Sequence, residues 1–250
     1  MASDNPAGAP AAKKVAVFDL DGTLLDTTRD LALAVNHTLA AFGMPELSQE
    51  QVIAYTGNGI VRLMEQSVPA GTPRDVWERA FEEFKRYYGA HALDHTLPYA
   101  GVPECVAALR AAGVAVAVVS NKADFAVQEI IDARMPGCFD AVLGECEARG
   151  IRRKPAPDMV LAVLEQLGAD RDGLIYIGDS EVDVACAKAC GCPCVSVSWG
   201  FRSREELVAA GATRIVDTPD ELQRGLLSMS ARIPPTALRL RLPNKSNSFG

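Results

Sequence analysis

The sequence predicts an α/β fold in which a parallel sheet is covered by helices and a helical cap domain is inserted after the first strand. Short apolar runs without polar alternation are typical of strands that are buried on both faces. Patterns with helical spacing separate these runs, and such alternation favours a parallel sheet. About 95 residues lie between the first apolar run and the second, far more than one crossover helix requires.

The elements follow in order along the chain. Strands are expected over the apolar runs 15–18, 114–119, 141–143, 174–177 and 195–197. Helices are expected over 102–111, 125–133, 159–167 and 182–189, each before one of the later strands. Residues 28–95 contain further apolar positions at helical spacing, such as Leu31, Val35 and Leu39. We expect this cap to lie over the carboxyl end of the sheet, where open α/β sheets bind ligands.

The two ends of the chain are expected to lie outside the fold. Residues 1–12 are rich in Ala, Pro and Gly, which is typical of a disordered tail, and residues 229–250 contain a Pro-Pro pair and end in small and polar residues. We therefore expect the core at 13–27 and 96–228, the cap at 28–95, and a flexible C-terminal tail at 229–250.

Composition excludes several classes of protein. With 250 residues, of which 48% are hydrophobic, the chain has enough apolar material for a sizeable core, so wholesale disorder is excluded. A formal net charge of -7 argues against nucleic acid as a partner. The sequence contains no apolar run as long as a membrane span and no apolar stretch near its start, so we expect no membrane partner and a cytoplasmic location.

The cysteines also fit a reducing cytosol, because they number 7, an odd count. Four of them form a C-x3-C-x-C-x-C cluster, at Cys186, Cys190, Cys192 and Cys194. This spacing lacks the well-spaced second pair of a zinc site, so ordinary core packing is favoured over a metal or redox role.

Two carboxylates follow the first predicted strand. Asp19 and Asp21 are two residues apart, so strand periodicity directs both side chains to the same side. Acids held together in a crevice repel each other unless a cation or a shared proton is present, so the pair predicts a hard metal such as Mg²⁺. Gly22 and Thr23 come next and allow a tight turn. The alternative is an acidic helix cap and turn.

Further acids follow the fourth predicted strand. Asp179, Ser180 and Asp183 begin a helix at the same edge of the sheet, so Asp179 is expected to bind the metal directly, with Ser180 and Asp183 supporting it from behind. The alternative for Asp183 is a purely local cap or salt bridge.

Two further segments carry polar or basic groups: one directly follows the second predicted strand, and the other directly precedes the helix predicted over 159–167. Ser120 and Asn121 could form a phosphate cradle together with free backbone N–H groups. Lys154 lies in a Lys-Pro-x-Pro segment whose prolines stiffen the backbone before a helix. An ammonium fixed in this way would stabilise negative charge in a transition state.

In combination, these motifs resemble those of the haloacid dehalogenase superfamily of phosphotransferases. Their order is Asp-x-Asp-Gly-Thr, Ser-Asn-Lys, Lys-Pro-x-Pro and Gly-Asp-Ser-x-x-Asp, and the resemblance spans about residues 13–225. It implies a Rossmann-like core with a helical cap. Within the superfamily the chain looks most like phosphoglycolate phosphatases, on residues 19–45, 55–59 and 189–193.

The resemblance also implies roles for the site residues. Asp19 would be the nucleophile that forms an aspartyl-phosphate, and Asp21 would be the general acid and base. Mg²⁺ would be held by Asp19, Asp179 and the main-chain carbonyl of Asp21. The groups expected on the substrate or its phosphoryl group are Ser120, Asn121, Lys154, Gly22, Thr23 and, in the cap, Thr56, Gly57 and Asn58. Asp183 would orient the metal waters or the lysine.

The function expected from this resemblance is hydrolysis of a small anionic phosphomonoester such as 2-phosphoglycolate by a monomer or a homodimer. Two alternatives remain. A phosphosugar mutase of the β-phosphoglucomutase type shares the four motifs, but such mutases carry a cap histidine where this chain has Leu31. A non-catalytic, Mg²⁺-binding protein of the receiver type would keep the acids, but receivers lack a cap.

Overall fold

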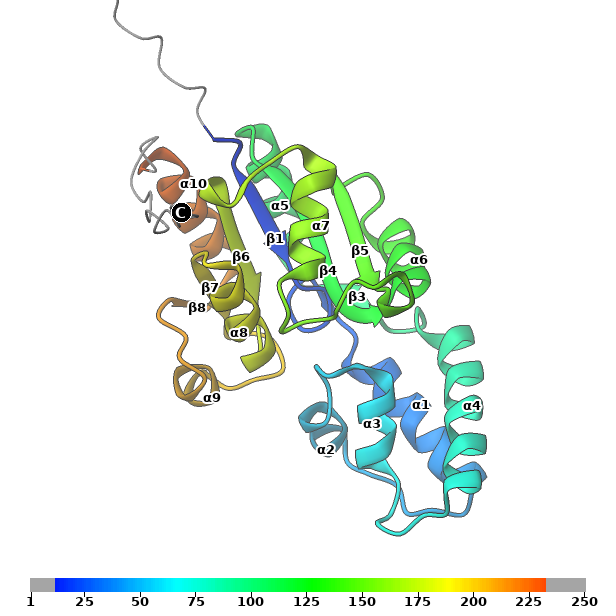
Figure 1. Ribbon diagram of the computed structural model, residues 1–250. Helices are drawn as coiled ribbons and strands as arrows, with labels where there is room; N and C mark the ends of the chain where they lie inside the picture. Colours follow the sequence, from blue (N-terminus) through cyan, green and yellow to red (C-terminus); the bar gives the residue numbers. More distant parts are fainter. Residues whose placement is uncertain (1–11, 233–250) are drawn as a thin grey trace, which may run out of the picture.

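The computed structural model describes residues 12–232, and its centre is one parallel sheet (Figure 1). The strand order is β5-β4-β1-β6-β7-β8, and every pairing is parallel. The strands are β1 (Val15–Phe18), β4 (Ala115–Ala123), β5 (Ala141–Glu145), β6 (Leu174–Gly178), β7 (Cys194–Val197) and β8 (Ile215–Val216). The parallel sheet and its five predicted strands are confirmed, and β8 is an addition of two residues.

Both faces of the sheet are covered, as the unbroken apolar runs predicted. Along β1, Val15 and Val17 pack against α7 and α8, whereas Ala16 and Phe18 pack against α5, α6 and α10. The bounds of these helices are α5 (Val102–Ala111), α6 (Asp124–Arg134), α7 (Asp158–Leu167), α8 (Glu181–Cys190) and α10 (Pro219–Arg232). The short helix α9 (Arg204–Ala209) precedes β8. Because successive side chains of a strand point to opposite faces, four consecutive apolar residues require a helical layer on each side.

The cap is a bundle of four helices at the carboxyl ends of the strands (Figure 1). They are α1 (Thr28–Ala41), α2 (Gln49–Ala54), α3 (Gly59–Ser67) and α4 (Arg74–His91). The cap has its own apolar core, in which Leu39, Met64 and Phe84 are fully buried. The cap therefore does not depend on the sheet to bury its apolar residues.

Two chain segments connect the cap with the core, and they are tied to each other. The antiparallel pair β2 (Leu25–Asp26) and β3 (Leu97–Pro98) brings them side by side. Buried Asp30, in the first turn of α1, accepts hydrogen bonds from the backbone N–H groups of His95 and Thr96 and from the Thr96 hydroxyl. The hinge between the domains is thus a paired element with a buried carboxylate beside it.

The ends of the chain fall partly outside this description. The tail predicted over residues 1–12 is described only at residue 12, and residues 233–250 lie outside the described residues, so both tail predictions stay predictions. At the C-terminus, helix α10 continues to Arg232, beyond the boundary at residue 228 that the sequence predicted for the core.

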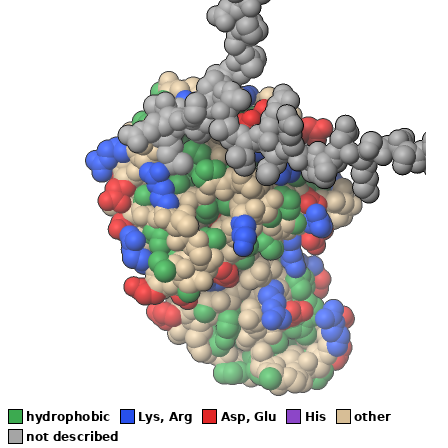
Figure 2. All heavy atoms as spheres, turned by 60° about the vertical axis from the view of Figure 1, so that its left-hand side comes forward, with side chains coloured by type: hydrophobic (Ala, Val, Ile, Leu, Met, Phe, Trp, Pro, Cys, Tyr) green, Lys and Arg blue, Asp and Glu red, His purple; other side chains and the backbone are tan. Residues whose placement is uncertain are grey.

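The surface shows no dominance of one charge on the face drawn in Figure 2, where basic and acidic side chains are interspersed outside the grey atoms. None of the helices within residues 12–232 combines the length and the apolar character needed to cross a bilayer.

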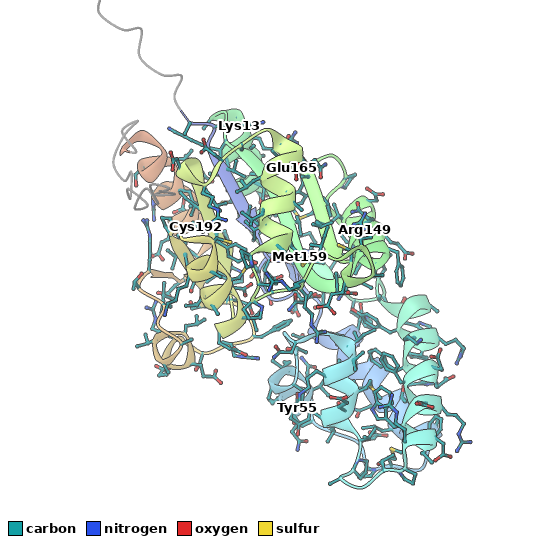
Figure 3. All side chains as sticks on the ribbon, in the orientation of Figure 1. Lys13, Tyr55, Arg149, Met159, Glu165 and Cys192 are labelled. Atoms are coloured by element: carbon teal, nitrogen blue, oxygen red, sulfur yellow. The ribbon has the colours of Figure 1, made fainter. Side chains whose placement is uncertain are left out.

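All seven cysteines are free, and Cys192 lies in the core, away from the cap (Figure 3).

Candidate active site

Three buried carboxylates converge at the carboxyl end of the sheet. Asp19 follows β1, and Asp179 and Asp183 follow β6, its direct neighbour in the sheet. One carboxylate oxygen from each lies within 4.8 Å of the other two. Lys154 enters the same space from the loop before α7, and its ammonium lies 2.7 Å from Asp19 and 2.8 Å from Asp183. One buried lysine thus partly offsets the charge of three buried acids.

Asp179 is held from two sides. The Thr23 hydroxyl donates to one of its oxygens at 3.0 Å, and the backbone N–H of Phe201 donates to the other at 2.7 Å. The backbone passes very close to this carboxylate, because a Cβ atom on Gly22 or on Gly200 would lie within 2.5 Å of an Asp179 oxygen. Gly22 also has φ +82°, a conformation that glycine adopts without strain. A larger residue at either position would displace the acid.

Asp183 has a supporting position. One oxygen accepts from Lys154 and from the Tyr176 hydroxyl, and the other accepts from the backbone and hydroxyl of Ser180 in a capping box at the start of α8. The capping and salt-bridge roles therefore occur together. Each Asp183 oxygen accepts from two protein donors, whereas each Asp179 oxygen accepts from one. Asp183 is therefore suited to orienting Lys154 rather than to binding a metal directly.

The charges of the cluster are strongly perturbed. Burial, reinforced by the charges of Asp183 and Asp179, holds the pKa of Asp19 well above its usual range despite the nearby lysine. Burial and the charge of Asp183 raise the pKa of Asp179 to about 7. Burial alone would lower the pKa of Lys154, but Asp183 and Asp19 raise it, so the lysine remains an ammonium.

This donor set fits a hard divalent cation. Such cations prefer oxygen ligands, and the cluster supplies buried carboxylates in excess of the positive charge beside them. Asp19 and Asp179 are the side chains suited to hold it. A cation there would compensate the charge that burial now penalises.

Asp21 belongs to a separate hydrogen-bonded group. The Lys122 ammonium donates to an Asp21 oxygen at 2.6 Å, and the Thr27 hydroxyl donates to the same oxygen at 2.8 Å. Lys122 also donates to the hydroxyl of Tyr88, at 2.7 Å, on the cap helix α4. Asp19 and Asp21 thus open into one pocket, as their spacing predicted, but each has its own lysine.

The cap forms the other side of this pocket, which encloses about 590 Å³ of empty space, part of it open to solvent. Arg202 fastens this side to the core, because its guanidinium donates to the carbonyl of Thr56 and to the core residue Glu181. Tyr55 marks the cap and Met159 the core in Figure 3. The cap residues that line the pocket are Leu31, Thr56, Gly57, Gly59, Ile60 and Leu63.

Three residues expected on the substrate have partners within the protein, and a fourth lies outside the pocket. The Asn121 side chain lines the pocket, bonds the backbone of Lys154 through both its oxygen and its nitrogen, and also donates to the Gly57 carbonyl. Gly22 and Thr23 pack against Asp179 instead. Asn58 is exposed and does not line the pocket. The expectations came from the phosphate-cradle pattern and from the family resemblance, neither of which shows the partners that the fold gives these side chains.

Other predicted residues line the pocket together with Asn121. Ser120 is buried in its wall and accepts a hydrogen bond from the backbone of Lys122, which leaves its own hydroxyl proton available. Ser180, Thr56 and Gly57 also line it.

Sequence reasoning gave no role to Lys122, Tyr88 or Arg202. Lys122 directly follows Ser120 and Asn121, and Arg202 follows the fifth predicted strand, so the rule that strand ends carry function points to both. Tyr88 lies inside an ordinary amphipathic helix, and no sequence signal marks it.

Comparison with known proteins agrees with this geometry. The family model of haloacid dehalogenase-like hydrolases matches residues 16–197. A protein of Pseudomonas savastanoi pv. phaseolicola named phosphoglycolate phosphatase is 32% identical over 225 residues, covering 88% of this chain and 82% of its own. One of the same name from Aquifex aeolicus is 33% identical over 190 residues, covering 75% of this chain and 86% of its own.

A solved structure from Lactobacillus delbrueckii subsp. bulgaricus is also similar. Its name assigns it provisionally to the phosphoglycolate phosphatases, and it is 36% identical with a TM-score of 0.81, covering 86% of this chain and 99% of its own. The family match runs from β1 to β7 and includes every acid of the buried cluster. The chain therefore belongs to the haloacid dehalogenase-like hydrolase family.

Proposed function

We propose that the protein is a Mg²⁺-dependent phosphomonoester hydrolase that acts through an aspartyl-phosphate on Asp19. The observation that carries the proposal is the buried Asp19 carboxylate 2.7 Å from the Lys154 ammonium, beside Asp179 and beneath a cap. Bound Mg²⁺, held by Asp19, Asp179 and the main-chain carbonyl of Asp21, would offset the negative charge of the acids and of the phosphoryl oxygens. This arrangement allows a carboxylate to approach a phosphate dianion.

The chain's own residues account for two successive displacements. In the first, an Asp19 oxygen bonds to phosphorus, the ester P–O bond breaks, and Asp21 gives its proton to the leaving oxygen. In the second, Asp21 takes a proton from water, the water oxygen bonds to phosphorus, and the bond between phosphorus and the Asp19 oxygen breaks. Asp21 thus ends the cycle protonated, as it began.

Lys154 and Ser120 complete the phosphoryl site. Two of the three N–H donors of Lys154 meet Asp19 and Asp183, so one remains for a phosphoryl oxygen. Asp183 and Asn121 fix this lysine through its ammonium and its backbone, respectively. Donors fixed before the reaction stabilise transition-state charge without reorganising.

We propose 2-phosphoglycolate as the leading substrate candidate. The names of the relatives at 32% and 33% identity support it. The mutase alternative requires a proton-transferring side chain for a sugar hydroxyl, whereas the apolar Leu31 lines this pocket. Water is therefore favoured as the final phosphoryl acceptor.

A phosphate-release screen tests the function. Phosphoglycolate, sugar phosphates and nucleotides are compared at matched concentration, and kcat/KM is determined for each, with EDTA and then with Mg²⁺ restored. We expect phosphoglycolate to give the highest value and EDTA to abolish release reversibly. Faster conversion of β-glucose 1-phosphate to glucose 6-phosphate would replace hydrolysis with the mutase reaction, and full turnover in EDTA would contradict the metal requirement.

A further inference from the structure

A second buried lysine in the pocket has an unused donor. Lys122 is 7% exposed, and it lines the pocket beside Asp21. Its ammonium carries three N–H donors, of which two meet Asp21 and Tyr88 within the described residues. A buried ammonium with an unused donor beside an open cavity is suited to bind an anionic group.

The other cations of the pocket are committed elsewhere. Lys154 serves Asp19, Asp183 and, by the proposed function, the phosphoryl group. Four of the five N–H donors of Arg202 meet Glu181 and the backbone carbonyls of Ile53 and Thr56, at the contact between cap and core. Among the cations lining the pocket in the described part of the chain, Lys122 is the one that combines an unused donor with direct contact to Asp21.

We propose that Lys122 binds a second anionic group of the substrate, a carboxylate one carbon away from the leaving oxygen. The inference rests on the proposed function, which places the leaving oxygen within hydrogen-bond reach of Asp21. Lys122 lies 2.6 Å from the same carboxyl group, so a substituent next to the leaving oxygen falls beside its ammonium. The site would thus select phosphate esters of 2-hydroxy acids over esters of uncharged alcohols.

Tyr88 is the positioning residue of this site. Its hydroxyl accepts from Lys122 at 2.7 Å and comes from α4, so the cap holds the ammonium on the side of the cavity. The substrate-binding lysine of the core is thereby connected to the domain that covers it.

Lys122→Met tests the proposal, with phosphoglycolate and ethyl phosphate as paired substrates. Both have a primary alcohol as leaving group, but only phosphoglycolate has the carboxylate. We expect the ratio of their kcat/KM values to fall by about 10- to 100-fold, because a hydrogen bond to a charged group contributes about 1.5–3 kcal/mol. An equal loss on both substrates would show that Lys122 acts only through Asp21, and would overturn the proposal.

Binding measurements separate this proposal from the proposed function. Calorimetric titration of both esters into Asp19→Asn and into Asp19→Asn with Lys122→Met, each loaded with Mg²⁺, requires no turnover. We expect a preference for phosphoglycolate in the first protein and its loss in the second; a preference retained in both would contradict the role of Lys122. If the wild type bound phosphoglycolate selectively but hydrolysed neither ester, the proposed function would fail while the lysine site stood.

Two further variants control for folding and position. Lys85→Met changes an exposed lysine of α4 and should leave the selectivity unchanged. Tyr88→Phe keeps the aromatic ring, so it is expected to fold even if Lys122→Met does not. It should raise KM for phosphoglycolate several-fold more than KM for ethyl phosphate; an equal rise for both would contradict the positioning role.

Discussion

The two walls of the pocket are built in different ways. The core wall includes side chains at strand ends, such as Asp19, Asp21, Ser120 and Asp179, and Lys154 from the loop before α7. The cap wall consists of Leu31, on α1, and of Thr56, Gly57, Gly59, Ile60 and Leu63, from the turn before α3 and from α3 itself. The core wall is polar, charged and fixed by a parallel sheet, whereas the cap wall is largely backbone and apolar side chain.

This difference suggests a division of roles, in which the core wall carries out the reaction and the cap wall selects the leaving group. The cap wall touches the core wall through a few polar contacts, such as the 3.1 Å bond from Asn121 to the Gly57 carbonyl. A change in the cap wall should therefore alter which leaving group fits without moving Asp19. The variants below test that separation.

The largest effect is expected in the core wall, from Asp19→Asn. The amide cannot act as the nucleophile, so phosphate release should fall by on the order of 10⁴-fold or more. The measurement is phosphate release together with acid-trapped phosphoenzyme, which should disappear. The control is Asp26→Asn, an exposed acid of β2 outside the pocket. Near-normal turnover of Asp19→Asn would contradict the assignment of Asp19 as the nucleophile.

The hinge between the walls gives the next effect, on stability. Asp30→Asn replaces a buried charged acceptor of three donor groups, so it should lower the free energy of unfolding by about 2 kcal/mol. Urea denaturation measures this change. Asp75→Asn, in the exposed first turn of α4, should change it by less than about 0.5 kcal/mol. Equal changes would mean that the hinge carboxylate does not hold the walls together.

The metal affinity of the core wall should depend on pH. The pKa of Asp179 is raised to about 7, and the metal requires the deprotonated form, so protons compete below that pH. Mg²⁺ affinity should fall by up to about tenfold for each pH unit below about 7 and level off above it. Calorimetric Mg²⁺ titrations across this range measure it. A flat profile would contradict Asp179 as a ligand.

The smallest effect is expected from Ile60→Ala in the cap wall. Removing part of an apolar contact should raise KM about three- to tenfold and leave kcat within about threefold. Steady-state kinetics separate the two, and Val61→Ala, at the exposed neighbouring position, is the matched control. A loss in kcat as large as that of a core acid would break the separation between the walls.

The sequence predicted the fold better than the contacts. Strands that are buried on both faces can be recognised in the sequence as apolar runs. In contrast, β2, β3 and β8 have two residues each and carry no periodic signal. The acids were located because parallel strands end at one edge. Their partners could not be inferred, because Thr23 meets Asp179 across 156 positions and Lys122 meets Tyr88 across 34.

The insertion of the cap sets the order in which the chain can assemble during synthesis. β1 is made first, yet Val15 pairs with Ala115 on one side and Leu174 on the other, both of which follow the entire cap. The cap buries its own apolar residues, so it is free to fold as soon as α4 has left the ribosome. Until β4 and β6 have been synthesised, β1 is an apolar strand whose two edges are unpaired. The growing chain therefore carries a folded domain beside an aggregation-prone strand, and protection of β1 should govern how much of the chain reaches the native state.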